Sequence, residues 1–326
     1  MTAQRILLLA ALALGACTET GSSPTPPDAF GPEGLAFPDG FPSEQPDQGV
    51  PTDLSPPTDG AAPQPSLLQG LTLMVNLGDS LAAGYYASSG HSYRALLVKN
   101  DDLLYPAYAK HDLKSLFPVI KIVDKSKSGS TTKDVAGQAS SVAGNPVGNT
   151  LVLISAGGND FNDKLQVMID PVQTMAAAKA AVANLTKIKN HFANKTLYPG
   201  KVFIVMLNVH DPTDGVGTLP AISGLTGFCS TIRGPIGLLF GPIAIQNLGT
   251  FNKELATFAA ASQEVSPVDN HQAFLGHGYH YQDKTKPHYD AGDPTLWFHN
   301  DCAHLNNLGH HHLRRLIWQA LGGTTN

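Results

Sequence analysis

The sequence predicts an α/β fold: a three-layer α/β/α sandwich in which helices cover both faces of a central, mostly parallel sheet. Short apolar runs typical of buried strands alternate along the chain with longer segments of helical periodicity. Such alternation favours parallel strands that are joined by crossover helices. Residues 68–326 also have a suitable length for one α/β domain.

The expected strands are five apolar runs that are rich in aliphatic residues. The first spans residues 71–77 and ends in Gly78-Asp79-Ser80-Leu81. The others span residues 119–124, 150–155, 201–208 and 264–268. Gly78 lets the backbone turn sharply after the first strand. Ser80 is therefore expected at the carboxyl end of that strand, where open α/β sheets build their sites.

The expected helices are three segments with apolar residues at helical spacing. In the first, residues 172–192, these residues are Met175, Ala178, Val182, Leu185 and Ile188. The second helix spans about residues 248–261 and the third spans residues 308–320. A stretch rich in glycine and proline, residues 211–245, separates the fourth strand from the second helix.

Residues 1–67 contain no pattern that is typical of a folded domain. Residues 1–16 combine one basic side chain with an apolar run, which is typical of a secretory signal peptide and too short to span a bilayer. Leu14-Gly15-Ala16-Cys17 resembles the lipobox of bacterial lipoproteins, which implies cleavage before Cys17 and lipidation of its thiol. The alternative is an ordinary secretory signal with an incidental Cys17. Residues 17–67, rich in proline and aspartate, are expected to form a disordered tether.

Acidic charge is concentrated in the tether. This segment contains eight acidic residues and no Lys or Arg, whereas the net charge of the whole chain is −5. The folded part is therefore close to neutral, and it has no basic cluster. We expect no nucleic-acid partner, because such a partner needs a positively charged surface.

Four polar, turn-forming segments are expected to meet at one edge of the sheet. Three follow the first three strands and contain Ser80, Gly129 and Asn159, and the fourth contains Asp301 and His304. Ester hydrolysis needs a serine nucleophile, an imidazole that takes its proton, a carboxylate that orients the imidazole, and donors for an oxyanion. These segments supply all of them. Taken singly, each segment also fits a turn or a helix cap without a catalytic part.

The four segments resemble, in order, the sequence blocks of the GDSL esterases, also called SGNH hydrolases. The blocks are Gly78-Asp79-Ser80-Leu81, Gly129, Gly157-Gly158-Asn159-Asp160 and Asp301-Cys302-Ala303-His304. The resemblance covers nearly the whole folded part and implies the flavodoxin-like fold of that family. One departure is Leu305, which stands where the family usually has proline.

The resemblance also implies a role for each of these residues. Ser80 would be the nucleophile, His304 the base and Asp301 the acid that orients the base. The backbone N–H groups of Ser80 and Gly129, with the side-chain amide of Asn159, would form the oxyanion hole. We expect no cofactor and no metal ion to take part.

Two features of the folded part leave alternatives open. Cys229 and Cys302 form either one disulfide bond, as an exported protein allows, or two buried thiols. If they pair, residues 211–245 would be tied to the segment that contains Asp301 and His304. The same stretch, which includes Ile236-Gly237-Leu238-Leu239-Phe240, either walls or covers an acyl pocket or is a loop with a short buried helix.

Histidines are concentrated near the C-terminus, where nine of the thirteen lie between His271 and His312. Their spacing lacks a metal-binding pattern such as His-Glu-x-x-His, so we expect solvated or hydrogen-bonded side chains. A histidine-rich metal-binding lipoprotein is the alternative that this composition leaves open.

The sequence as a whole predicts a serine hydrolase of the bacterial cell envelope. It would cleave a carboxylic ester of a small molecule, a lipid or a glycan, through an acyl-serine intermediate outside the cytoplasm. We expect a monomer that the lipid on Cys17 anchors to a membrane. The alternatives are a carbohydrate O-acetylesterase on the same fold and a non-catalytic lipoprotein that binds partners at the cell surface.

Overall fold

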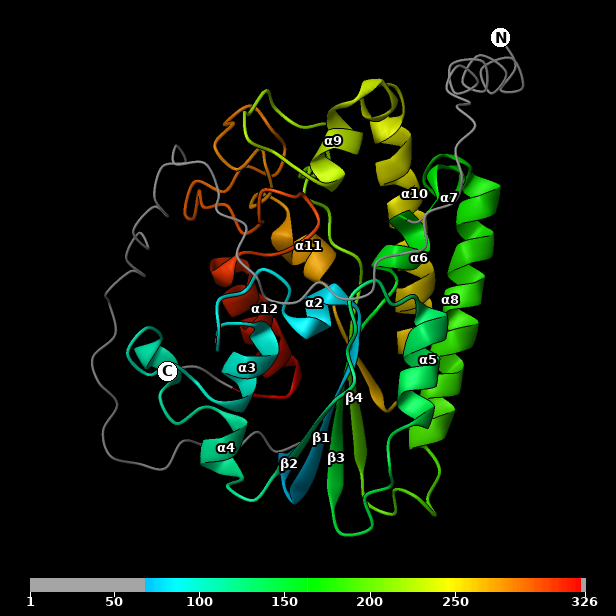
Figure 1. The fold of residues 1–326 in the computed structure, drawn as a ribbon, viewed down its shortest axis with the longest axis vertical. Coiled ribbons are helices and arrows are strands. Elements are labelled where there is room, and N and C mark those ends of the chain that lie inside the picture. Colours follow the sequence, from blue (N-terminus) through cyan, green and yellow to red (C-terminus); the bar gives the residue numbers. More distant parts are fainter. Residues whose placement is uncertain (1–67, 163, 324–326) are drawn as a thin grey trace, which may run out of the picture. The chain divides into compact units, whose positions relative to one another are not determined.

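The centre of the fold is a five-stranded sheet (Figure 1). A computed structural model describes residues 68–162 and 164–323, so the predicted signal peptide, Cys17 and the tether lie outside the described residues. The strands are β1 (Leu71–Gly78), β2 (Lys121–Asp124), β3 (Asn149–Ser155), β4 (Val202–Leu207) and β5 (Val265–Val268). Their order is β2-β1-β3-β4-β5, and every neighbouring pair is parallel. This is the flavodoxin-like order.

Helices cover both faces of the sheet, which confirms the predicted three-layer α/β/α class (Figure 1). One face carries α5 (Thr132–Ser140), α8 (Pro171–Phe192) and α10 (Pro235–Ala260), and the other carries α3 (Tyr93–Val98), α4 (Leu113–Leu116) and α12 (Asn307–Ala320). Successive side chains of a strand point to opposite faces. In β1, Leu73 and Val75 accordingly pack in the cluster that contains Leu185 of α8, while Met74 packs in the cluster that contains Leu313 of α12.

Short helical segments lie in the connections. They are α2 (Ser80–Ala83), η2 (Pro106–Tyr108), α6 (Gly158–Asn162), α7 (Leu165–Ile169), α9 (Phe228–Arg233) and α11 (Asn270–Phe274). Two of them matter most for the site, because α2 follows β1 and α6 follows β3 at the carboxyl edge of the sheet. Within the described ranges, no helix combines the length and the apolar character that crossing a membrane requires.

Helix α10 is longer than the sequence predicts. It runs for 26 residues from Pro235, so the expected start at about residue 248 was wrong. The expectation failed because glycine and proline are poor helix formers, and Pro242 removes a backbone hydrogen bond inside the helix. Packing against α7, α8 and α9 compensates. At Gly241 a Cβ atom would lie only 1.8 Å from the carbonyl oxygen of Gly217, so this glycine permits a close backbone contact.

The outer strand β2 is shorter than expected. The apolar run begins at Val119, but β2 begins at Lys121. Val119 is exposed and lies in a turn, which a hydrogen bond from the N–H of Ile120 to the carbonyl oxygen of Phe117 closes (3.0 Å). The other strand boundaries differ from the expected ones by at most one residue at each end.

Candidate active site

Ser80 stands at the point where β1 ends and α2 begins. Gly78 has a φ of +146°, and a Cβ atom there would lie 2.2 Å from the carbonyl oxygen of Ser155, so this position needs glycine. Asp79 caps α2, since its Oδ1 accepts hydrogen bonds from the N–H of Leu81 (3.1 Å) and the hydroxyl of Ser155 (3.0 Å). These contacts fix Ser80 as the first residue of α2, where a backbone N–H has no partner within the helix.

Ser80, His304 and Asp301 form one hydrogen-bonded chain. His304 Nε2 lies 2.7 Å from Ser80 Oγ, and His304 Nδ1 lies 2.5 Å from Asp301 Oδ2. The other carboxylate oxygen of Asp301 accepts hydrogen bonds from the backbone N–H groups of Ala303 (3.1 Å) and His304 (3.0 Å). The structure therefore brings together the three side chains that the sequence places at the site, and the turn that carries two of them is closed by its own hydrogen bonds.

The charge of Asp301 sets the tautomer of His304. Burial raises the pKa of Asp301, but its hydrogen bond to His304 and the attraction between the two groups outweigh burial, so this pKa lies below its usual value. An ionised Asp301 accepts a hydrogen bond from the N–H at His304 Nδ1. Nε2 then carries a lone pair and accepts a hydrogen bond from the hydroxyl of Ser80.

Gly129 lies in the loop between β2 and α5, and Asn159 lies in α6, which is hydrogen-bonded to that loop and to the start of α5. Asn159 Nδ2 donates to the carbonyl oxygen of Ser130 (2.9 Å). The carboxylate of Asp160 accepts from the N–H (2.8 Å) and the hydroxyl (2.6 Å) of Thr132. Gly129, with a φ of +78°, precedes Ser130 in the loop between β2 and α5. The segments that follow β2 and β3 are thus held together as one unit.

Gln138 of α5 ties this unit to the end of β1. Its Nε2 donates to the carbonyl oxygen of Gly78 (2.9 Å) and to Ser130 Oγ (3.0 Å), while its Oε1 accepts the N–H of Gly78 (2.8 Å). The loop that contains Gly129 is therefore fixed beside the turn that places Ser80.

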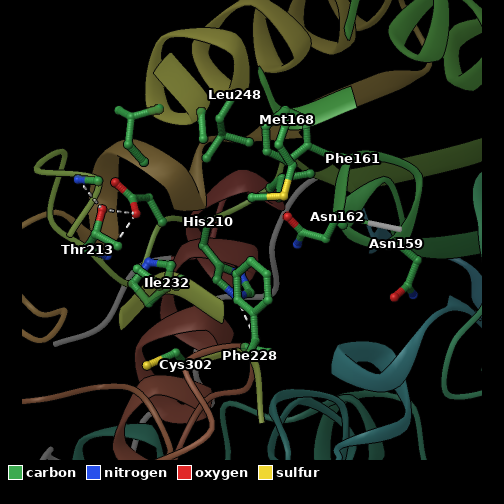
Figure 2. Close-up of a pocket in the computed structure, with 18 of the residues that line it drawn as sticks. Asn159, Phe161, Asn162, Met168, His210, Thr213, Phe228, Ile232, Leu248 and Cys302 are labelled. Carbon is green, nitrogen blue, oxygen red and sulfur yellow. Dashed lines mark hydrogen bonds between the residues drawn. The ribbon is translucent and has the colours of Figure 1, made fainter. Parts of the chain in front are cut away.

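An apolar cavity of about 170 Å³ lies beside Ser80, His304 and Asn159. Figure 2 shows part of its lining. About 10–15 Å³ on this scale holds one water molecule, so the cavity has room for an acyl chain of several carbons. Its walls come from α6, α7, α9 and α10, with side chains that include Phe161, Met168, Phe228, Ile232, Phe240 and Leu248. The stretch 211–245 therefore walls this cavity, and part of it is helical.

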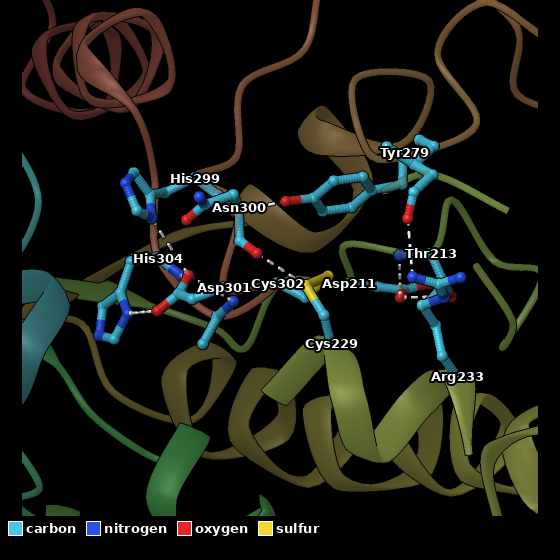
Figure 3. The surroundings of a disulfide bond; sticks show 12 residues. Asp211, Thr213, Cys229, Arg233, Tyr279, His299, Asn300, Asp301, Cys302 and His304 are labelled. Atoms are coloured by element: carbon cyan, nitrogen blue, oxygen red, sulfur yellow. Dashed lines mark hydrogen bonds and ion pairs between the residues drawn. A yellow bond between two sulfur atoms is a disulfide. The ribbon is translucent and has the colours of Figure 1, made fainter. Parts of the chain in front are cut away.

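A disulfide bond joins Cys229 of α9 to Cys302, in the turn that follows Asp301 (Figure 3). The N–H of Cys229 also donates to the carbonyl oxygen of Asp301 (3.2 Å), and the N–H of Thr226 donates to that of Asn300 (2.9 Å). Of the two alternatives that the sequence leaves open, the structure has the bonded pair. The wall of the cavity and the turn that positions the imidazole are thus joined covalently.

His210 is a partly buried residue of the site that sequence reasoning missed. It follows β4 and lines the cavity, and its Nε2 lies 2.9 Å from the carbonyl oxygen of Ala303. Burial lowers the pKa of His210 to about 4, so at neutral pH the uncharged ring donates its Nε2 proton to that carbonyl. His210 thereby stabilises the turn between Asp301 and His304 through the carbonyl of Ala303. Its place after a parallel strand is the one signal that the sequence offers.

Histidines 310–312 are packed within α12. The Nδ1 of His310 accepts the N–H of Tyr93 (3.3 Å), and Arg314 donates to the Nδ1 of His311 (2.9 Å). Burial lowers the pKa of each of the three rings, so they are uncharged at neutral pH. Among the residues that the structure describes, no three His, Cys, Asp or Glu side chains are grouped so as to hold a metal ion.

Comparison with solved structures finds similar chains of low sequence identity. An extracellular lipase from Streptomyces rimosus is 19% identical, with 76% of this chain and 99% of that chain covered and a TM-score of 0.48. A phospholipase A1 from Streptomyces albidoflavus is 17% identical, with 77% and 99% covered and a TM-score of 0.47. A variant of an acetyl xylan esterase from Geobacillus stearothermophilus is 17% identical, with 78% and 95% covered and a TM-score of 0.43.

A comparison with curated proteins found no match. The sequence does match the model of the GDSL-like lipase/acylhydrolase family over residues 77–312, which is most of the chain and contains all four of the blocks described above. The protein therefore belongs to the GDSL-like lipase/acylhydrolase family of ester hydrolases.

Proposed function

We propose that this protein hydrolyses carboxylic esters of the esterase or lipase type through an acyl-serine intermediate on Ser80. The observation that carries the proposal is the hydrogen-bonded chain from Asp301 through His304 to Ser80 Oγ, which ends beside an apolar cavity. A hydroxyl that is hydrogen-bonded to a properly oriented imidazole is an activated nucleophile.

In the first half of the reaction, Ser80 Oγ attacks the carbonyl carbon of the ester while His304 Nε2 takes the hydroxyl proton. Asp301 keeps the ring in the required tautomer and stabilises the imidazolium that forms. His304 then gives this proton to the departing alcohol oxygen, and the acyl group stays on Ser80. In the second half, water replaces the alcohol and the same steps release the acid and restore Ser80.

The negative charge on the carbonyl oxygen would be stabilised by three donors. These are the backbone N–H groups of Ser80 and Gly129 and one N–H of the Asn159 side-chain amide. Asn159 uses its other amide proton to hold the carbonyl of Ser130 (2.9 Å), which orients the side chain before substrate arrives. The loss of one such donor typically reduces the rate about 100- to 1000-fold.

The size and the apolar lining of the cavity favour a longer acyl chain over an acetyl group. A carbohydrate O-acetylesterase, the alternative on the same fold, needs space for only two acyl carbons. Here aromatic and aliphatic side chains of four helices line the space, and burial of each acyl methylene contributes about 0.8 kcal/mol. We therefore place an acyl chain of several carbons in this cavity.

We also propose that the enzyme acts outside the cytoplasm, on a lipid anchor at Cys17. The apolar segment before Cys17 supports export, and the Cys229–Cys302 bond supports an oxidising compartment. In the bacterial host, the wild type should fractionate with membranes and Cys17→Ser should be soluble. Membrane association of Cys17→Ser equal to that of the wild type would contradict the anchor.

Covalent labelling tests the proposed chemistry. A fluorophosphonate should label the wild type and leave Ser80→Ala unlabelled, and Ser80→Ala should lose activity on p-nitrophenyl esters by at least about 1000-fold. Ser140→Ala removes an exposed hydroxyl at the end of α5 and is the matched control, with labelling equal to the wild type. A folded wild type that resists the probe and cleaves no ester would contradict the proposal.

A further inference from the structure

We propose that Tyr85, Tyr86 and His299 form a subsite for the alcohol part of the ester, and that this subsite favours alcohols with a flat ring. The inference rests on the proposed function and extends it from the acyl group to the leaving group. None of the three residues belongs to the four sequence blocks, and local spacing gives no signal for them.

Reaction geometry determines where the alcohol must lie. The alcohol oxygen receives its proton from His304 Nε2, so the alcohol part of the substrate must pass next to the His304 ring. The acyl chain takes the cavity on the other side of the carbonyl. Tyr85, Tyr86 and His299 are not among the described residues that line that cavity. The alcohol therefore leaves the cavity and meets the side chains that border His304 outside it.

The three aromatic rings border His304 at this place. The ring of Tyr85 lies 4.8 Å from the ring of His304, and that of Tyr86 lies 5.5 Å from it, edge to face. Tyr86 also stacks on His299, with ring centroids 3.7 Å apart and planes within 10°. Tyr85 and Tyr86 are each 47% exposed. Two large aromatic side chains are thus held open to solvent directly beside the proposed base.

The backbone holds Tyr86 in a conformation that a bulky side chain rarely adopts. Its φ is +63°, in the left-handed region, which costs about 1 kcal/mol or more for such a residue. Strain of this kind persists where the surrounding structure imposes it, and it is typical of functional sites. In this conformation the Tyr86 ring stacks on His299 and lies beside His304.

The loop that carries the two tyrosines is anchored at both ends. The N–H of Tyr85 donates to the carbonyl oxygen of Ser80 (2.9 Å). Ser88 is bound twice by Asn307 at the start of α12: its N–H donates to Asn307 Oδ1 (2.9 Å), and Asn307 Nδ2 donates to its hydroxyl (3.0 Å). The subsite is therefore fixed to the nucleophile on one side and to the helix after His304 on the other.

The chemistry of these side chains selects an uncharged ring. Burial lowers the pKa of His299 and raises the pKa of Tyr86, so at neutral pH these two stacked rings are uncharged. Aromatic faces attract flat apolar surfaces, and the tyrosine hydroxyls can bond to polar groups at their edges. Both an aromatic alcohol and the C–H face of a sugar ring offer such a surface, whereas a straight alkyl alcohol does not.

Three butanoate esters test the subsite: those of benzyl alcohol, of the primary hydroxyl of glucose, and of n-hexanol. All three form the same butanoyl-enzyme, so an effect of the alcohol appears in kcat/KM and not in the shared deacylation step. Tyr86→Gly removes the ring and suits the positive φ, and Tyr85→Ala removes the second ring. Tyr86→Phe is the matched control, because it keeps the ring.

In Tyr86→Gly and Tyr85→Ala, we expect kcat/KM to fall for the benzyl ester, the glucose ester or both. The fall should be about 3- to 10-fold larger than the fall for the hexyl ester. Tyr86→Phe should keep the wild-type ratio. A selective loss on the glucose ester alone identifies a sugar, and a loss on the benzyl ester alone identifies an aromatic alcohol. Equal changes on all three esters, or no change, would overturn the subsite.

Labelling of Ser80 separates this result from the proposed function. A fluorophosphonate carries no alcohol of this kind, so its reaction reports the nucleophile alone. A wild type that labels and cleaves all three esters, but whose variants keep the same ratios, would reject the subsite and leave the proposed function intact. A wild type that neither labels nor cleaves any ester would reject both.

Discussion

Asp79 is a carboxyl group buried directly before the proposed nucleophile. It accepts hydrogen bonds from the N–H of Leu81 and the hydroxyl of Ser155, which fixes the start of α2. Burial raises its pKa to about 6, because these hydrogen bonds and the nearby His304 compensate only part of the lost hydration. The folded state therefore resists ionisation of this residue.

The variant Asp79→Asn should show the corresponding pH dependence of stability. The folded pKa lies above the unfolded value, so the contribution of Asp79 to stability is fully present below about pH 4 and is lost as the pH rises through about 6. An asparagine cannot ionise. Relative to the wild type, the free energy of unfolding of Asp79→Asn should increase by about 1–2 kcal/mol between pH 5 and pH 8. Urea denaturation at the two pH values measures it, and a constant difference would contradict the raised pKa.

The candidate site could be predicted where its signals are local. Ser80, Asn159 and the Asp301–His304 pair each stand in a short block with turn-forming neighbours, and their chemistry is complementary. His210 and Tyr86 could not be predicted. His210 acts through a contact with the carbonyl of Ala303, 93 residues away, and Tyr86 acts through a backbone angle that no local pattern encodes.

At the scale of elements, periodicity predicted the strands and helix α8 but only half of α10. β1, β3 and β4 are buried on both faces and therefore read as continuous apolar runs. The first half of α10 contains Gly241 and Pro242, whose local preferences oppose a helix. It is helical because contacts with α7, α8 and the loop at Gly217 outweigh those preferences. Such contacts are not visible in a sequence window.

The Cys229–Cys302 bond couples two elements that are 73 residues apart in the chain. Loss of a crosslink that closes a loop of this length should destabilise the fold by about 4 kcal/mol. The variant Cys229→Ala/Cys302→Gly removes the bond without straining the backbone, because Cys302 has a φ of +59°. We expect the urea midpoint to fall and kcat to decrease, since the turn with Asp301 and His304 loses its tie to α9.

Cys229→Ala/Cys302→Ala is the comparison for that experiment. It lacks the bond and keeps a side chain at a position that favours glycine, so it should be less stable than the variant with glycine by about 1 kcal/mol. Wild-type stability and kcat in both variants would show that the bond does not support the turn.

At the scale of the whole molecule, uncharged buried histidines make folding sensitive to acid. His210 and histidines 310–312 all have pKa values lowered by burial. Between these values and 6.5, the unfolded chain binds more protons than the folded protein. The contribution of these neutral histidines to the free energy of unfolding is therefore fully present above pH 6.5 and is lost as the pH falls.

We expect the free energy of unfolding to fall by a few kcal/mol per pH unit below pH 6.5, since each such histidine contributes up to about 1.4 kcal/mol per unit. Asp79 opposes this trend but is a single group. Because folded proteins are stable by only about 5–15 kcal/mol, the protein should unfold before about pH 4. Urea midpoints followed by circular dichroism at pH 7, 6 and 5 measure the slope. A stability that is flat over this range would contradict the burial of these rings as neutral groups.

The disulfide bond also makes the covalent structure of the enzyme depend on an oxidation that follows synthesis. A newly made chain has two thiols at Cys229 and Cys302, and the tie between α9 and the turn after Asp301 forms only when an oxidant removes two electrons from them. Formation of this bond thus needs an electron acceptor in addition to the polypeptide itself. If kcat depends on this bond as expected above, oxidation of the two thiols determines when ester cleavage reaches its full rate.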